Sequence, residues 1–122
     1  MKASHLSGIV VAALVMTTTS VSQTKSLSYK QDVQPVVKQY CLPCHLEESE
    51  NPSDLFMDDF EKLSKGGRNG PAVLAQKPKE SNFYLKLLPD PPFGKQMPRT
   101  KKKLKDDEVK LIYDWILQGA KP

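Results

Sequence analysis

The stretch Cys41-Leu42-Pro43-Cys44-His45 constrains this chain more than any other feature of its sequence. It has the pattern C-x-x-C-H, in which two thiols lie one helical turn apart and an imidazole follows directly. This spacing lets both thiols add across the two vinyl groups of one porphyrin, and it brings the imidazole beneath the iron. The motif therefore predicts one covalently attached haem c, held by Cys41 and Cys44, with His45 as the proximal ligand of the iron.

Three other uses of paired cysteines are the alternatives to haem attachment. A zinc site needs about four nitrogen or sulfur ligands, but outside residues 1–22 the chain has no other Cys and no other His. A redox-active dithiol would follow a strand of a βαβ unit, whereas the residues before Cys41 have helical periodicity. A structural disulfide across so short a loop would add little stability, because it would remove little chain entropy.

Residues 1–22 have the layout of a secretory signal peptide. Lys2 precedes an uncharged apolar run over residues 6–16, and a short segment of mostly small, polar residues follows. The apolar run is shorter than the roughly 20 residues that span a bilayer, and Ser20 and Ser22 favour cleavage before Gln23. We therefore expect a periplasmic or otherwise exported protein with no stable membrane span after cleavage. An uncleaved membrane anchor is the alternative.

Residues 23–122 are expected to form a single domain. The chain of 122 residues is 39% hydrophobic and 7% aromatic, which makes a modest core. A buried porphyrin would enlarge that core, as staples do in other small domains. The formal net charge of +4 is not the profile of a nucleic-acid-binding protein, so no nucleic-acid partner is expected.

Two segments have the periodicity of amphipathic helices. The first carries apolar residues at positions i, i+3, i+4 and i+7, namely Val33, Val36, Val37 and Tyr40. The second repeats this spacing, with Trp115 flanking the apolar face, in Val109, Ile112, Tyr113 and Ile116. Asp32 is the expected N-cap of the first helix, and Gly119 is expected to follow the end of the second. Shorter helices are expected near residues 58–64 and after a capping Ser81. With no convincing strand pattern, the chain is expected to be all-α.

The remaining segments are expected to be loops. Residues 23–28 should form a loose leader, and residues 47–54 an acidic surface loop with no site. The glycine-rich segment 64–71 could let the backbone approach the edge of the cofactor, where Arg68 would pair with a haem propionate or stay solvated. The basic run formed by Lys101, Lys102, Lys103 and Lys105 could steer an acidic partner, or could simply be a solvated face.

Taken in order, these motifs resemble the class I c-type cytochromes, and most closely the planctomycete-type cytochrome c domain. The resemblance extends over residues 29–122, and its haem motif is its most specific part. The other matching stretches are Asp32-Val33-x-Pro35, Leu55-x-Met57-Asp58, Gly66-Gly67-x-x-Gly70-Pro71-Ala72, Lys77-Pro78-x-x-Ser81, Met97-Pro98 and Trp115-Ile116-x-x-Gly119-Ala120. One departure is Gln76-Lys77-Pro78, where the family often has P-G-x-P.

The resemblance implies a small class I cytochrome c fold, with helices wrapped around a covalently attached haem. It also implies His/Met ligation and electron transfer in the periplasm, rather than an enzymatic activity. The partner would then be another redox protein, such as a dehydrogenase, an oxidase or a second cytochrome. A haem-based, peroxidase-like enzyme and a gas or redox sensor module are the alternative functions, and an enzyme of that kind would need an open position on the iron.

The sequence offers few candidates for the second axial ligand. Outside residues 1–22, Met57 and Met97 are the only methionines, and no second His remains. Met57 follows the motif closely and is expected to line the wall of the haem pocket. Met97 is far enough along the chain to reach the opposite haem face, and the prolines around it stiffen its loop. We therefore expect His45 and Met97 to bind the iron; a Met97 that only fills the core is the alternative.

Overall fold

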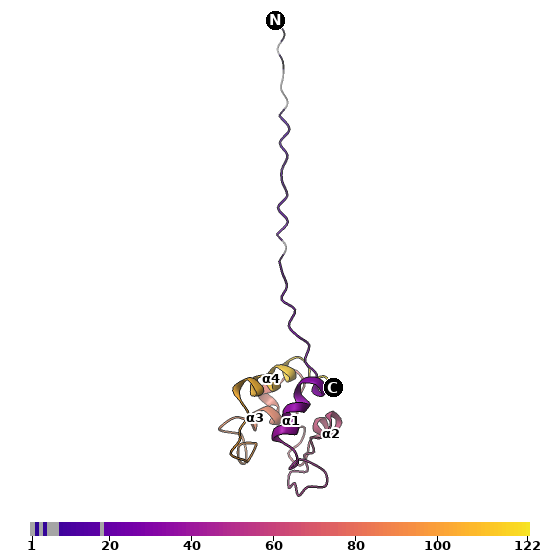
Figure 1. The fold of residues 1–122 in the computed structure, drawn as a ribbon, viewed down its shortest axis with the longest axis vertical. Helices are drawn as coiled ribbons and strands as arrows, with labels where there is room; N and C mark the ends of the chain where they lie inside the picture. The colour runs from indigo at the N-terminus through magenta and orange to yellow at the C-terminus, as the bar shows by residue number, and fades with distance from the viewer. Residues whose placement is uncertain (1, 3, 5–7, 18) are drawn as a thin grey trace.

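The computed structural model describes residues 2, 4, 8–17 and 19–122. The expected signal peptide thus lies partly outside the described residues, at positions 1, 3, 5–7 and 18. Residues 8–17 and 19–26 are exposed and have no regular secondary structure, and they lead away from the helical part of the molecule (Figure 1). Among the described residues, no helix has the length and apolar character needed to cross a membrane.

The first helical segment consists of η1 (Tyr29–Val33) and α1 (Gln34–Tyr40). The expected apolar face is confirmed, because all four of its residues are buried: Val33, Val36, Val37 and Tyr40. The expected N-cap, Asp32, is wrong. Ser28 caps the segment by accepting a hydrogen bond from the Gln31 N–H, and the Asp32 carboxylate accepts one from the Ser28 N–H at 2.9 Å. This reciprocal pairing begins the helix one turn earlier than expected, since it satisfies two otherwise free N–H groups.

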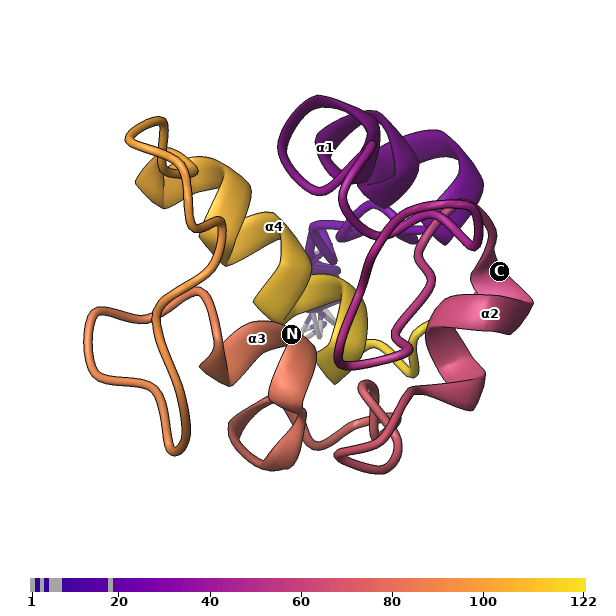
Figure 2. The same cartoon turned by 90° about the horizontal axis from the view of Figure 1, so that it is seen from below.

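The last helix, α4 (Asp106–Leu117), crosses the middle of the molecule, with α1 and two short helices, α2 (Phe60–Lys65) and α3 (Asn82–Leu85), around it (Figure 2). Its expected end is confirmed, because Gly119 follows it with a φ of 106° that favours glycine. Trp115 does not flank the apolar face as expected but forms its centre. It is 0% exposed, and its ring centroid lies 6.0–6.4 Å from those of three other aromatic residues, Tyr29, Phe60 and Phe83.

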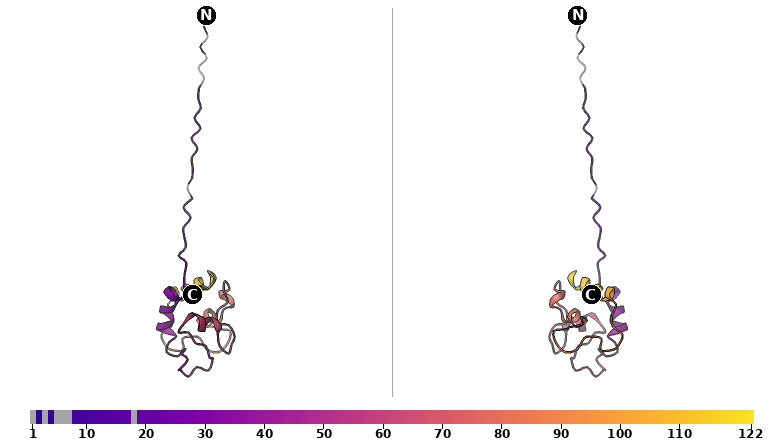
Figure 3. Two further views of the ribbon diagram at one scale, coloured as in Figure 1. Left: turned by 90° about the vertical axis from the view of Figure 1, so that its right-hand side faces the viewer. Right: turned by 90° about the vertical axis from the view of Figure 1, so that its left-hand side faces the viewer.

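The end of the leader is bound to the C-terminal end of the chain, contrary to the loose leader expected over residues 23–28. The Gln118 side chain accepts a hydrogen bond from the Leu27 N–H at 2.8 Å and donates one to the Lys25 carbonyl at 3.2 Å. The Tyr29 N–H donates to the Lys121 carbonyl at 2.9 Å. Figure 3 shows the C-terminus beside the point where the N-terminal segment joins the helices. These contacts order the leader from Lys25 onward.

The short helices lie close to where the sequence predicts them. The Asp59 carboxylate caps α2 at the Lys62 N–H, at 2.8 Å. Ser81 immediately precedes α3, after the turn η2 (Pro78–Glu80), but its hydroxyl does not cap that helix. It accepts from the Leu74 N–H and donates to the Lys77 carbonyl, both at 2.8 Å, because the residue is fully buried beneath this turn.

The all-α prediction holds for the part of the chain that the structure describes, where helices and long loops occur without a strand. The backbones of Gly67 and Gly70 form one isolated antiparallel β-bridge. Long loops follow α1 and α3, and these two loops carry the residues that the sequence singles out.

Candidate cofactor site

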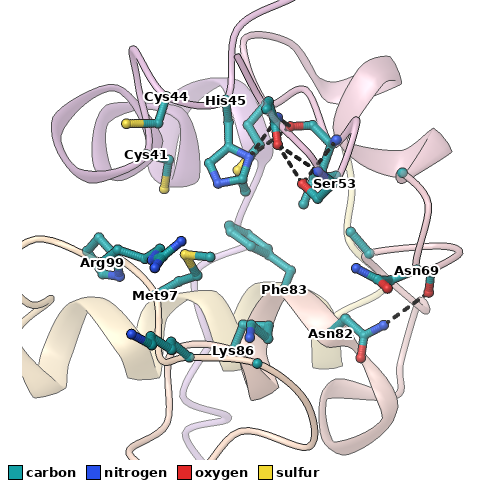
Figure 4. Close-up of a pocket in the computed structure, with 18 of the residues that line it drawn as sticks. Cys41, Cys44, His45, Ser53, Asn69, Asn82, Phe83, Lys86, Met97 and Arg99 are labelled. Atoms are coloured by element: carbon teal, nitrogen blue, oxygen red, sulfur yellow. Dashed lines mark hydrogen bonds between the residues drawn. The ribbon is translucent and has the colours of Figure 1, made fainter. Parts of the chain in front are cut away.

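A cavity of about 580 Å³ lies between the loop after α1 and the loop after α3. Cys41, Cys44 and His45 line it from the first loop, and Met97 lines it from the second. Figure 4 shows the His45 ring and the Met97 side chain reaching into the same space from opposite sides. The fold thus brings all four residues predicted from the sequence to one cavity.

The lining of this cavity suits a flat, largely apolar molecule of cofactor size. Most of its wall is made by apolar and aromatic side chains, among them Tyr40, Leu55, Met57, Ala72, Phe83, Leu87, Phe93 and Pro98. Cationic side chains of Lys86, Lys95 and Arg99 also line it. Burial, together with the nearby Arg99, lowers the pKa of Lys86, so an anionic group would relieve this charge. A porphyrin with two carboxylates matches both properties.

The imidazole of His45 is held so that one nitrogen is free for the cavity. Its Nδ1 lies 2.8 Å from the Leu55 carbonyl oxygen. Because a carbonyl oxygen can only accept, this contact requires the proton on Nδ1 and leaves the Nε2 lone pair available for a metal. The His45 carbonyl in turn accepts from the Met57 N–H at 2.9 Å. The backbone of His45 and that of residues 55–57 are thus held together.

Asn51 is a site residue that sequence reasoning missed, since residues 47–54 were expected to form a loop with no site. Its Nδ2 donates to the Leu55 carbonyl at 2.6 Å and lies 3.2 Å from His45 Nδ1. Its Oδ1 accepts from the Ser53 N–H at 3.2 Å and the Ser53 hydroxyl at 2.6 Å. The bond from the Ser53 N–H to the Asn51 side chain defines an Asx turn. Asn51-Pro52-Ser53 is a typical sequence for such a turn, so this turn could have been predicted from the sequence.

The two cysteines differ in exposure. Cys41 is partly buried and Cys44 is exposed, and both thiols are free. Burial raises the pKa of the Cys41 thiol to about 12, with a smaller contribution from Cys44. This thiol is therefore mainly protonated at neutral pH, which disfavours a redox-active dithiol because disulfide exchange uses the thiolate. Within the described residues, no group of three or more His, Cys, Asp or Glu side chains could hold a metal ion.

Met57 and Met97 occupy different environments. Met57 is 3% exposed, and its carbonyl accepts from the buried Tyr29 hydroxyl at 2.6 Å. Burial raises the pKa of that hydroxyl, and nearby acidic groups reinforce the shift. Met97 is only partly buried, and its N–H donates to the Lys86 carbonyl at 2.7 Å. Both residues line the cavity, but only Met97 comes from the loop facing His45.

The glycine-rich loop packs against the loop that holds His45. A Cβ on Gly67 would lie 2.2 Å from the Ser53 carbonyl oxygen, so only glycine permits this approach. The sequence predicts that this loop approaches the cofactor edge, but its closest backbone contact is with residues 53–55. Gly67 and Gly70 also line the cavity. Arg68 lies at the surface and pairs with the exposed Asp54 at 2.6 Å.

One family of known proteins matches the part of the chain that lines this cavity. Residues 41–99 match the family model described as Planctomycete cytochrome C. This match confirms the resemblance over these residues, which include most of those that line the cavity. The match begins at Cys41 and ends two residues after Met97. No match was found to a curated protein or to a solved structure.

Proposed function

We propose that this chain is an exported c-type cytochrome that transfers electrons through one haem c. Cys41 and Cys44 would form the thioether bonds, and His45 and Met97 would bind the iron from opposite faces. The observation that carries the proposal is that the C-x-x-C-H motif and Met97 line the same cavity from opposite loops. When bound, the haem supplies a one-electron couple at its iron.

The residues of the chain have three tasks in this proposal. His45 presents Nε2 because its Nδ1 proton is donated to Leu55. The apolar wall keeps water from the cofactor, which influences the reduction potential. The Met97 loop is held at two adjacent positions, since the Met97 N–H donates to the Lys86 carbonyl and the Gln96 side chain donates to the Leu87 carbonyl at 2.8 Å. A loop fixed in this way has little conformational entropy left to lose on ligation.

Binding of carbon monoxide tests this function against the peroxidase-like and sensor alternatives. An electron carrier with both axial positions filled should bind CO poorly after reduction, because Met97 would have to leave first. The measurement is the absorption spectrum of the reduced protein before and after addition of CO. Rapid, stoichiometric formation of a CO complex would instead favour an enzyme or a sensor with an open iron.

The basic run is proposed to lie beside the mouth of the cavity and to attract acidic redox partners. Lys101, Lys102 and Lys103 are exposed and directly follow Arg99 and Thr100, which line the cavity. The Nζ of Lys102 lies 5.2 Å from the ring centroid of Tyr40, another lining residue. The run thus lies beside the cavity and is exposed to a partner, although Lys103 Nζ also donates to the Pro98 carbonyl.

Oxidation of the reduced protein by ferricyanide, an anion, should therefore slow as ionic strength rises, by about tenfold over the screening range. Reversing the charge at Lys101 and Lys105 should reduce both the rate at low salt and its salt dependence. Lys30→Glu is the matched control, because this exposed lysine belongs to η1 rather than to the rim. If neither salt nor the charge reversals at Lys101 and Lys105 change the oxidation rate, the basic run is only a solvated face.

A further inference from the structure

The Leu55 carbonyl oxygen accepts two hydrogen bonds at once. One comes from His45 Nδ1 at 2.8 Å, and the other comes from Asn51 Nδ2 at 2.6 Å. A carbonyl oxygen has two lone pairs and can serve both donors. The two donors nevertheless draw on the same oxygen, so each bond is weaker than it would be alone.

The orientation of the Asn51 amide follows from its other contacts. Its Oδ1 accepts both from the Ser53 N–H and from the Ser53 hydroxyl, and only an oxygen can accept these bonds. The NH2 group must therefore face Leu55 and His45. It cannot accept from His45, so its effect on the ring acts through the shared carbonyl.

The glycine-rich loop supports this arrangement from behind. The Ser53 carbonyl accepts from the Arg68 N–H at 2.7 Å, and Gly67 approaches so closely that no Cβ would fit. Ser53 is therefore fixed by a second segment of the chain, and through it Asn51 is fixed as well. The contact between Asn51 and Leu55 is thus held by tertiary structure.

We infer that Asn51 is a positioning residue that weakens the hydrogen bond from His45 to Leu55 and thereby raises the reduction potential of the haem. This inference rests on the proposed function. A strong hydrogen bond from the distant ring nitrogen makes a histidine ligand more electron-rich, and an electron-rich ligand favours the oxidised iron. By competing for the carbonyl, Asn51 weakens the hydrogen bond from His45. The imidazole is then less electron-rich, which favours the reduced iron.

The test compares Asn51→Ala with the wild type, each as the full chain carrying haem. With the competing donor gone, the His45 Nδ1 proton resonance of the reduced protein should move downfield, and the midpoint potential should fall. Ser53→Ala, which keeps the amide but loosens its anchor, should change both in the same direction by less. It also keeps the inference testable if Asn51→Ala fails to fold.

Gln34→Ala is the matched control, because the Gln34 amide donates to another carbonyl of the same segment, that of Asp58, at 3.3 Å. It should leave the resonance and the potential unchanged. An unmoved His45 resonance in both Asn51→Ala and Ser53→Ala, or an upfield shift with a higher potential, would overturn the inference and leave the proposed function intact. A wild type without covalent haem would overturn the proposed function, and with it this inference.

Discussion

Replacing both Cys41 and Cys44 by alanine is expected to abolish retention of haem in a denaturing gel. The thioether bonds are the only covalent links that the proposed site offers, and both thiols line the cavity. The wild-type band should stain for haem-dependent peroxidase activity, and the double variant should give no stain. Intact-mass measurement of the exported wild type should show one added haem and an N-terminus at Gln23.

The single variants are the informative controls for this prediction. Cys41→Ala and Cys44→Ala each leave one thiol, so each should keep its haem through a single thioether bond. Extraction of the wild type with acidified acetone should leave the stain in place, since a covalent bond resists this treatment. Release of the haem into the acetone would rule out covalent attachment.

The second large effect is expected at Met97. In Met97→Ala, the weak near-infrared absorption that arises from sulfur bound to ferric iron should disappear completely. The potential should fall, because a thioether ligand favours the reduced iron. The reduced variant should also bind CO readily, since one axial position would then be open.

Met57 provides the comparison, because it is the other methionine that lines the cavity. Met57→Ala should keep the near-infrared band, the potential and the poor CO binding. It should destabilise the fold by about 2–5 kcal/mol, as truncation of a buried methionine does, and Met57→Leu should avoid most of this loss. Loss of the band in the Met57 variants, with the band retained in Met97→Ala, would exchange the roles of the two residues.

Several local features of this protein could be predicted because they depend on residues close together in the chain. The inward face of η1 and α1 follows from the period of an α-helix, which carries every apolar position to the same side. The end of α4 at Gly119 follows from the conformational freedom of glycine. The C-x-x-C-H motif contains its chemistry within five residues, so its interpretation needed no knowledge of the fold.

The features that escaped prediction depend on contacts between distant segments. Periodicity indicated that Trp115 lies near the apolar face of its helix, but its central place depends on three aromatic rings from other parts of the chain. The leader was expected to be loose, because the sequence does not show that Gln118 meets Leu27 and Lys25. Ser81 precedes a helix as expected, yet its burial turned its hydroxyl toward other backbone groups.

Residue types and their spacing are enough to recognise the C-x-x-C-H motif, the helical segments and the resemblance to one family of cytochromes. Each of these predictions rests on side-chain types at short, regular spacings, which can be recognised without knowledge of the fold. Three contacts are visible only in the folded chain. Met97 lines the same cavity as His45, Gly67 permits the close approach of two loops, and Asn51 and His45 share the Leu55 carbonyl. The sequence does not reveal these contacts, because they join residues to distant side chains or to backbone atoms. A backbone carbonyl is present at every position, so no residue type marks the one that will be used.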